Sequence, residues 1–469
     1  MEEIKMRTDK PSKLWSQWLA ALSLHLLAVL DGLVAGWTSP YLAKLTNGTE
    51  SLTITNNQAS WIASLYLSSQ PIGSIFAAVI VRTIGTKKAV LFAGIPHALG
   101  WMCFLISESV PAIYTARIFG GSGFGIYYST FPLYIGEIAD PKIRGALVGV
   151  VAQGTGIGYL IGNFLGAYLP MRTFAVIGLT MSIIYMLSFF LIPDSSHYLI
   201  KRNKLTEAEK SLKWYNRKKD VKSELDALIT YIGKTEKFSL KAVARKFLSP
   251  LNRKLLIIII GINLFMHLSG VYVIAMYLEI LLTTLKINVI APSVVVIGVG
   301  VVAIIGGLVT TYTNDYFGRR TMLAVSALGV SVNFFLIGID FLLMTQGYNI
   351  SNYQIIIIAE FMLYIFFLNI GLANIPCCLL SEIFPTELKE FGSCTVSVVS
   401  AFAAFLAGKS YQPILDGTSE EFVFFLSAFA LLFMFIYTIT VVPETKGKSL
   451  REIQEMLMNK SERIEKIED

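Results

Sequence analysis

Long apolar stretches separated by short charged segments dominate the pattern of side chains along the chain. A helix needs roughly 20 mostly apolar residues to cross the hydrocarbon core of a bilayer. Eleven uncharged runs approach or exceed that length: residues 51–81, 89–107, 118–136, 145–171, 173–193, 255–278, 287–314, 321–339, 361–381, 391–408 and 422–443. Residues 14–37 form a twelfth run that only Asp31 interrupts. The pattern therefore predicts an all-α, polytopic membrane protein with twelve transmembrane helices.

The composition agrees with a membrane protein and excludes a soluble enzyme. Only 15% of the 469 residues are charged and 54% are apolar, whereas soluble proteins are roughly 25% charged. The formal net charge is +7, but the basic residues lie between the apolar runs, so we expect no nucleic-acid partner. The sequence contains no P-loop, no His-Glu-x-x-His and no Gly-x-Ser-x-Gly nucleophile motif. We expect no enzymatic activity, no metal and no cofactor.

The distribution of Lys and Arg predicts the orientation of the chain in the membrane. If the N-terminus is cytoplasmic, the inner segments hold 34 of the 39 Lys and Arg residues and the outer loops hold four. Because cytoplasmic loops carry an excess of positive charge, we expect both termini in the cytoplasm of a plasma-membrane protein. Two Asn-x-Ser/Thr sequons, at Asn47 and Asn349, then lie outside as candidate N-glycosylation sites.

The two halves of the chain repeat one another. Glu137 and Arg144 recur as Glu382 and Lys389, each 245 residues later, and the segment around Gly85 recurs around Gly318, 233 residues later. We therefore expect two parallel six-helix halves, residues 1–193 and 255–443, a cytoplasmic linker with short helices at 194–254, and a tail at 444–469. Such a duplicated bundle leaves a cavity between its halves near the midplane, which suits alternating access.

These motifs resemble the sugar porters of the major facilitator superfamily. The match includes Asp315-x-x-Gly318-Arg319-Arg320 and Pro443-Glu444-Thr445-Lys446-Gly447, while Gly36-Trp37-Thr38-Ser39-Pro40 is similar to the arthropod branch that includes facilitated trehalose transporters. The resemblance implies the major facilitator fold and transport of a hexose or trehalose by alternating access, with facilitative uniport favoured over proton symport. It also implies a monomer whose partners are the sugar, the lipid bilayer and, in the symport alternative, a proton.

The chain departs from the family pattern where sugar is usually bound. Met266-His267 replaces a pair of glutamines in span 7, Ala373-Asn374 begins the altered segment of span 10, and Ser400-Ala401 replaces an Asn-Trp pair in span 11. The alternatives are therefore a transporter-like sugar sensor, or a porter of another polyol or small organic solute.

Sugar hydroxyls both donate and accept hydrogen bonds, so a sugar site needs inward-facing amides, hydroxyls or imidazoles and aromatic faces. Residues of these types within the spans are the candidate substrate-binding groups: Gln153, His267, Tyr272, Tyr277, Asn369, Asn374 and Ser400, with a further amide at Asn163. Of these, Gln153 and Tyr277 match the family's sugar-contact positions. The alternative for each residue is a hydrogen bond to a neighbouring helix.

Two further sets of charges carry predictions. Asp31 and Arg117 are ionisable groups within spans 1 and 4, and in the resemblance these spans are neighbours. We expect the two side chains to pair, either as a proton-coupling site or, preferably, as a static ion pair. At the inner mouth, opposite charges from both halves are expected to form a cytoplasmic gate: Glu137, Arg144, Asp315, Arg319, Arg320, Glu382 and Lys389.

Overall fold

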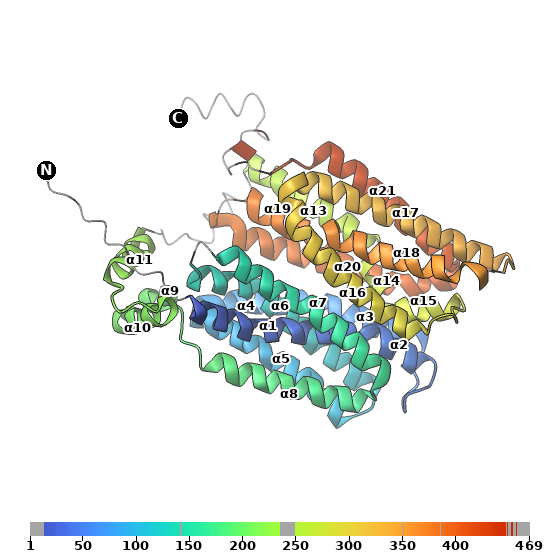
Figure 1. Cartoon of the computed structure of the whole chain (residues 1–469), viewed down its shortest axis with the longest axis horizontal. Helices are drawn as coiled ribbons and strands as arrows, with labels where there is room; N and C mark the ends of the chain where they lie inside the picture. Colours follow the sequence, from blue (N-terminus) through green and yellow to red (C-terminus); the bar gives the residue numbers. More distant parts are fainter. Residues whose placement is uncertain are drawn as a thin grey trace.

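The computed structural model describes residues 14–140, 143–234, 249–349, 351–384 and 386–446, together with positions 448, 452, 453 and 456 of the tail. Within these residues the fold is helical, without a strand. The helices form two bundles that lie side by side along their length, with a group of short helices beyond one end (Figure 1). We call the end that carries the short helices the inner end and the opposite end the outer end.

The first bundle contains helices from the N-terminal half of the chain. They are α1 Trp15–Gly36, α2 Thr38–Thr46, α3 Asn56–Ser68, α4 Gln70–Ile84, α5 Thr86–Ile106, α6 Val110–Ile138, α7 Arg144–Tyr168 and α8 Met171–Phe190. Helices α1 and α2 together form one span, and α3 and α4 together form the next. With α5, α6, α7 and α8 the bundle therefore contains six spans, as predicted.

The second bundle repeats this arrangement with more interruptions. Its elements are α13 Pro250–Leu268, α14 Val271–Met276, α15 Leu278–Thr284, α16 Pro292–Phe317, α17 Arg319–Thr345, the 3₁₀ turn η1 Ser351–Tyr353, α18 Gln354–Phe367, the π-helical turn η2 Leu368–Leu372, α19 Ile375–Ile383, α20 Thr386–Gly417 and α21 Glu420–Val441. Span 7 breaks at Gly270, whose φ of +74° favours glycine. Non-helical backbone at membrane depth is tolerated where it lines a cavity or is buried in protein.

Ten helical stretches of the described residues are long and apolar enough to cross a membrane. The other two long helices are α6, of 29 residues, and α20, of 32 residues. Their interiors carry Arg117 and Lys409 among many glycines and hydroxyl residues, which lowers their mean hydropathy. They run alongside the other ten (Figure 1), which gives the predicted twelve-span architecture.

Small residues allow the close packing of α1 against α7. A Cβ added at Gly32 would lie 2.2 Å from the Thr155 carbonyl oxygen, and one at Gly158 would lie 2.1 Å from that of Val29. Both distances are far below van der Waals contact, so a side chain at either position would push the helices apart. Helices in a membrane associate through such close backbone approach.

The predicted internal repeat is visible in the backbone. Gly85 precedes α5 with a φ of +90°, and Gly318 precedes α17 with a φ of +92°. Both residues make the same turn between consecutive spans, and both occupy a region of φ that side chains other than glycine rarely adopt. The 233-residue offset in sequence is thus an offset between equivalent turns.

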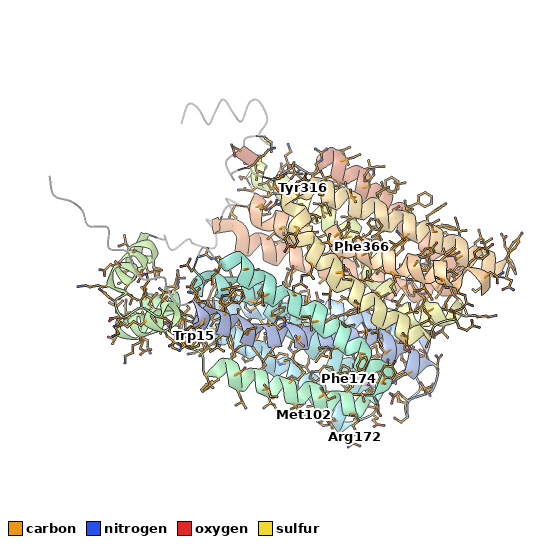
Figure 2. The ribbon with its side chains drawn as sticks, viewed as in Figure 1. Trp15, Met102, Arg172, Phe174, Tyr316 and Phe366 are labelled. Atoms are coloured by element: carbon orange, nitrogen blue, oxygen red, sulfur yellow. The ribbon has the colours of Figure 1, made fainter. Side chains whose placement is uncertain are left out.

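The predicted short helices between the halves are α9 Ser196–Lys201, α10 Leu205–Asn216 and α11 Lys222–Lys234. Helix α10 is fixed against the first bundle, because the hydroxyls of Tyr215 and Tyr134 lie 2.9 Å apart and Arg217 stacks 4.0 Å above the ring of Trp15. Figure 2 shows Trp15 beside these helices and Arg172 near the opposite end of the bundle.

Candidate functional site

The two bundles contact each other at the outer end. The Ser60 hydroxyl on α3 donates to the Gly408 carbonyl on α20 at 3.3 Å, and the Lys409 ammonium donates to the Asn57 amide oxygen at 2.8 Å. The backbone N–H of Glu279 on α15 donates to the Ser39 hydroxyl on α2 at 3.1 Å. These hydrogen bonds join the halves and close the outer end.

The inner ends of α6 and α7 have open space beside them. A Cβ added at Gly136, Gly145 or Gly149, at the inner ends of α6 and α7, would meet no heavy atom within 4 Å. Farther along α7, Ala152 is still exposed, Gln153 is half-buried and Asn163 is completely buried. The surroundings of α7 therefore change from open space at the inner end to complete burial toward the outer end.

Three of the predicted site residues of the C-terminal half present buried polar atoms that lack a partner. They are Nδ1 of His267 on α13, the hydroxyl of Tyr277 between α14 and α15, and Oγ of Ser400 on α20. Buried polar groups are nearly always hydrogen-bonded, so these three atoms are candidates for hydrogen bonds to a ligand. Aromatic rings lie beside two of them: Tyr272 is 5.4 Å from His267 and Tyr411 is 4.8 Å from Tyr277, measured between centroids.

Gln153 lies where α7 meets α16 of the other half. Its amide nitrogen would be only 3.3 Å from a Cβ added at Gly307, so the small residue leaves room for the amide between the halves. This placement is compatible with the predicted contact to substrate.

The two predicted asparagines of span 10 use their amides locally. Asn369 Nδ2 donates to the Ile365 carbonyl at 2.9 Å, and Asn374 Nδ2 donates to the Asn369 carbonyl at 3.0 Å. These bonds add to those that the two carbonyls already accept from the Leu368 N–H and the Thr310 hydroxyl, and they stabilise the π-helical turn. In this conformation the N–H groups of both amides have a structural role, and their contact with substrate stays a prediction.

One polar residue of α7, Tyr159, is not identified by the sequence analysis. The Tyr159 hydroxyl on α7 is buried and has no hydrogen-bond partner of good geometry, although the Asn163 amide lies near it. Its position one helical turn before Asn163 could have identified it, because residues four apart lie on the same face of a helix.

The predicted pair between Asp31 and Arg117 is wrong. Asp31 on α1 instead bonds His97 on α5, with Oδ1 and Nε2 2.6 Å apart and both side chains fully buried. The sequence could have indicated His97 as the partner, because it places an imidazole in the middle of span 3 and any ionisable group within a span needs a partner.

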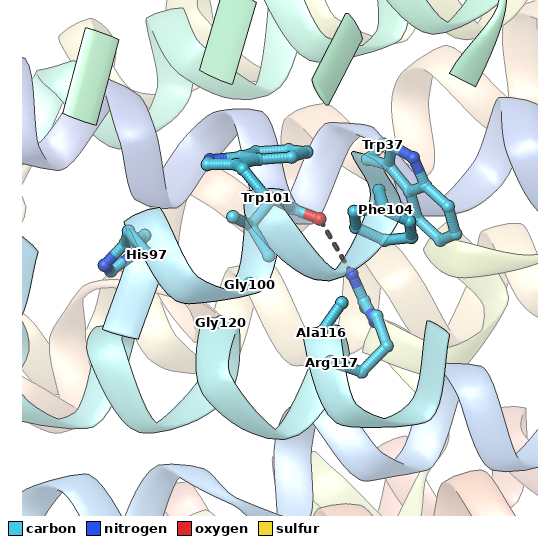
Figure 3. Close-up of a pocket in the computed structure, with 9 residues that line it drawn as sticks. Trp37, His97, Gly100, Trp101, Phe104, Ala116, Arg117 and Gly120 are labelled. Atoms are coloured by element: carbon cyan, nitrogen blue, oxygen red, sulfur yellow. Dashed lines mark hydrogen bonds between the residues drawn. The ribbon is translucent and has the colours of Figure 1, made fainter. Parts of the chain in front are cut away.

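The Arg117 guanidinium is hydrogen-bonded, but not to a carboxylate. Its guanidinium donates to the carbonyls of Val34, at 2.9 Å, and Ile62, at 3.1 Å, and to the Thr38 hydroxyl at 2.9 Å. It also lies 4.6 Å from the centre of the Tyr66 ring, a cation–π distance. Figure 3 shows His97 and Arg117 apart in a small pocket of the N-terminal bundle, with Gly100 and Trp101 between them.

The described charges of the predicted gate bond within their own halves. Glu137 accepts from the hydroxyls of Thr86, at 2.6 Å, and Ser195. Glu382 repeats this arrangement, since it accepts from the Thr445 hydroxyl at 2.5 Å and pairs with Arg319 at 3.0 Å.

The remaining gate residues complete the inner surface. The Arg319 and Arg320 backbone N–H groups donate to the Glu444 carboxylate at 3.0 and 3.1 Å, while Arg144 is exposed and donates to the Ala139 carbonyl. The side chains of Asp315 and Lys389 lie outside the described residues. With the inner end open, attraction between the halves stays a prediction for the inner-closed state.

Comparison with known proteins supports the interpretation of this fold. Residues 20–457 match the family described as sugar (and other) transporter. The chain is 27% identical to the facilitated trehalose transporter of Drosophila mojavensis over 99% of its length, although it spans only 54% of that protein. It is 28% identical to that of Bombyx mori, with 97% of this chain and 89% of the relative covered.

Solved structures share the architecture. The inward-open xylose transporter of E. coli aligns with a TM-score of 0.76 at 18% identity, covering 94% of this chain and 99% of that chain. A proton:xylose symporter of the major facilitator superfamily, bound to 6-bromo-6-deoxy-D-glucose, aligns with a TM-score of 0.73 at 18% identity, covering 95% and 99%. The chain has the major facilitator fold, and it belongs to the sugar transporter family, whose members are membrane transporters and not enzymes.

Proposed function

We propose that the protein carries a sugar, either trehalose or a hexose, across the plasma membrane by alternating access. One observation above all supports this proposal: unpaired polar groups from both halves, including Tyr159, His267 and Ser400, are buried in the interior, while the inner ends of α6 and α7 have open space beside them. A sugar can pair such groups because each of its hydroxyls both donates and accepts. Among sugars, the names of the relatives favour trehalose.

Facilitative uniport is the mode that we favour. A proton-coupling group must meet water on each side of the membrane in turn, whereas Asp31 and His97 form a closed pair within the N-terminal bundle. The groups nearest Arg117 also come from that bundle. A pair that stays shielded throughout the cycle stabilises the bundle and transfers no proton.

In this proposal the inner end is cytoplasmic and both termini lie there. The charge bias of the loops supports this orientation. Asn47 and Asn349 are exposed in loops of the opposite end, where glycosylation would take place. We propose that the protein works as a monomer, because each chain contains both halves.

The inner charges have a role in the cycle. When the inner end closes, charges that now bond within each half come within reach of the other half. A single exposed pair contributes about 0–1 kcal/mol, and several together can shift a two-state equilibrium.

The test is transport by the purified protein in liposomes. Radiolabelled trehalose, glucose and a polyol are supplied, with and without an imposed pH gradient. A uniporter equilibrates one of the sugars, and the final internal concentration equals the external one at every pH. Accumulation above that level only with acid outside would establish symport, polyol uptake alone would identify another porter, and sugar binding without uptake would indicate a sensor.

A further inference from the structure

One face of α7 carries further polar side chains beyond Gln153, toward the outer end. Ile161, Phe164 and Tyr168 are 37%, 51% and 60% exposed and mark the lipid-facing side of this helix. Tyr159 and Asn163 lie on the opposite side, because successive residues of a helix are rotated by about 100°. These two polar side chains therefore face the interior, where the C-terminal bundle lies.

The two side chains contain unpaired polar atoms. Asn163 has no exposed surface, and neither its amide oxygen nor its amide nitrogen makes a hydrogen bond. The Tyr159 hydroxyl lies near this amide and is also without a hydrogen-bond partner of good geometry. Leaving such groups unpaired in a dry interior is costly. A purely structural asparagine would bond to a neighbouring helix, and this one does not.

The pair is continuous with the site between the halves. Tyr364 on α18 lies near both Tyr159 and Tyr272, and the Tyr272 ring lies 5.4 Å from His267. Groups of the N-terminal bundle thus approach aromatic hydroxyls of the C-terminal bundle at this level of the membrane. This mixture of hydroxyls, an amide and ring faces suits a sugar ring.

The spacing along α7 indicates the size of the ligand. Ten residues separate Gln153 from Asn163, which corresponds to about 15 Å along the helix axis. One pyranose ring cannot reach both amides. A ligand that contacts both needs a second ring.

We propose that Tyr159 and Asn163 form a second sugar-binding subsite, which takes the outer ring of a two-ring sugar whose inner ring contacts Gln153. This inference rests on the proposed function and adds the residues that distinguish one-ring from two-ring sugars. A one-ring sugar bound at Gln153 leaves the subsite empty, so the subsite contributes to the affinity for disaccharides alone.

The test compares trehalose and glucose uptake in liposomes that contain wild type, Tyr159→Phe or Asn163→Ala. Tyr159→Phe removes one hydroxyl and keeps the ring, so it preserves packing. We expect each substitution to raise the KM for trehalose about tenfold, as the loss of one or two hydrogen bonds does, and to leave the KM for glucose within about twofold. Tyr168→Phe removes a hydroxyl from the lipid-facing side of the same helix and is the matched control, with both KM values unchanged.

The possible results separate this inference from the proposed function. If the wild type moves no sugar, the proposed function is wrong and the subsite falls with it. If the wild type moves sugar but Tyr159→Phe and Asn163→Ala change neither KM, or change both equally, the second subsite is wrong and the proposed function stands. Uptake of glucose without trehalose by the wild type would also overturn the subsite.

Discussion

Glu279 is the group at the outer contact whose protonation we expect to control opening. Its backbone N–H bonds to Ser39 across the two halves, and one of its carboxylate oxygens is buried without a partner. Burial raises the pKa of Glu279 to about 7, although the positive charge of Lys44 lowers it. Lys44 itself donates to the Leu169 carbonyl at 3.0 Å and lies 4.0 Å from Glu50.

The raised pKa links the outer contact to external pH. Opening of the outer end hydrates the carboxyl group and returns its pKa toward the ordinary value of about 4.3. The closed state binds the proton more tightly, so its advantage grows as the pH falls through 7 and is lost as the pH rises above 7. Between pH 8 and pH 6 the ratio of outer-closed to outer-open protein should rise about tenfold.

The assay is labelling of a cysteine at the closed contact. Ser60 is fully buried there, so Ser60→Cys, in a background without the native cysteines, reacts with an impermeant thiol reagent from outside only when the outer end opens. We compare this protein with one that also carries Glu279→Gln. Glutamine resembles the protonated carboxyl at every pH, so opening of the second protein should not depend on pH. Its labelling rate still changes with pH because the thiol itself ionises, and dividing the two rates removes this effect.

The ratio of the two labelling rates should be about tenfold higher at pH 8 than at pH 6. Glu50→Gln, which removes the other carboxylate near Lys44, should keep this dependence and is the control. If the ratio of rates does not change with pH, Glu279 does not control opening and the reasoning from its burial is refuted.

Four further substitutions test other parts of the molecule. His97→Ala leaves Asp31 buried without its partner and should cost about 3–5 kcal/mol, seen as a large fall in the thermal unfolding temperature in detergent; no fall would mean that the pair contributes nothing. Arg319→Ala removes the ion pair to Glu382 and should slow transport at normal surface expression, whereas normal transport would reduce this residue to a topology signal. Gln153→Ala should raise the KM of every transported sugar about tenfold, and an unchanged KM would remove it from the site. Asn47→Gln should abolish most of the mass shift caused by glycosidase, and an undiminished shift would contradict glycosylation at this position.

Much of the architecture could be predicted because it depends on local composition. The length of an apolar run decides whether a helix can span the bilayer, and a repeated motif such as that at Gly85 and Gly318 marks an equivalent turn in each half. The bonds of Glu137 and Glu382 are also equivalent in the two halves, since their partners Ser195 and Thr445 lie 250 residues apart in the sequence.

The partner of Asp31 could be decided only by the tertiary structure. The sequence shows that an acid within a span needs a partner, but several spans contain a candidate and the apolar pattern says little about which sides of two helices meet. In the fold, Asp31 meets His97, while Arg117 meets carbonyls of α1 and α3 and the face of Tyr66.

The same reason applies to the candidate site. The sequence by itself determined the spans, the repeat and the chemical types of residue available to bind a sugar. Which of these are unpaired, as Asn163 is, and which are used locally, as the Asn369 amide N–H is, depends on the rotation and contacts of each helix in the bundle. Membrane helices are apolar on nearly every face, so hydropathy alone does not fix that rotation, and close packing between particular helices does.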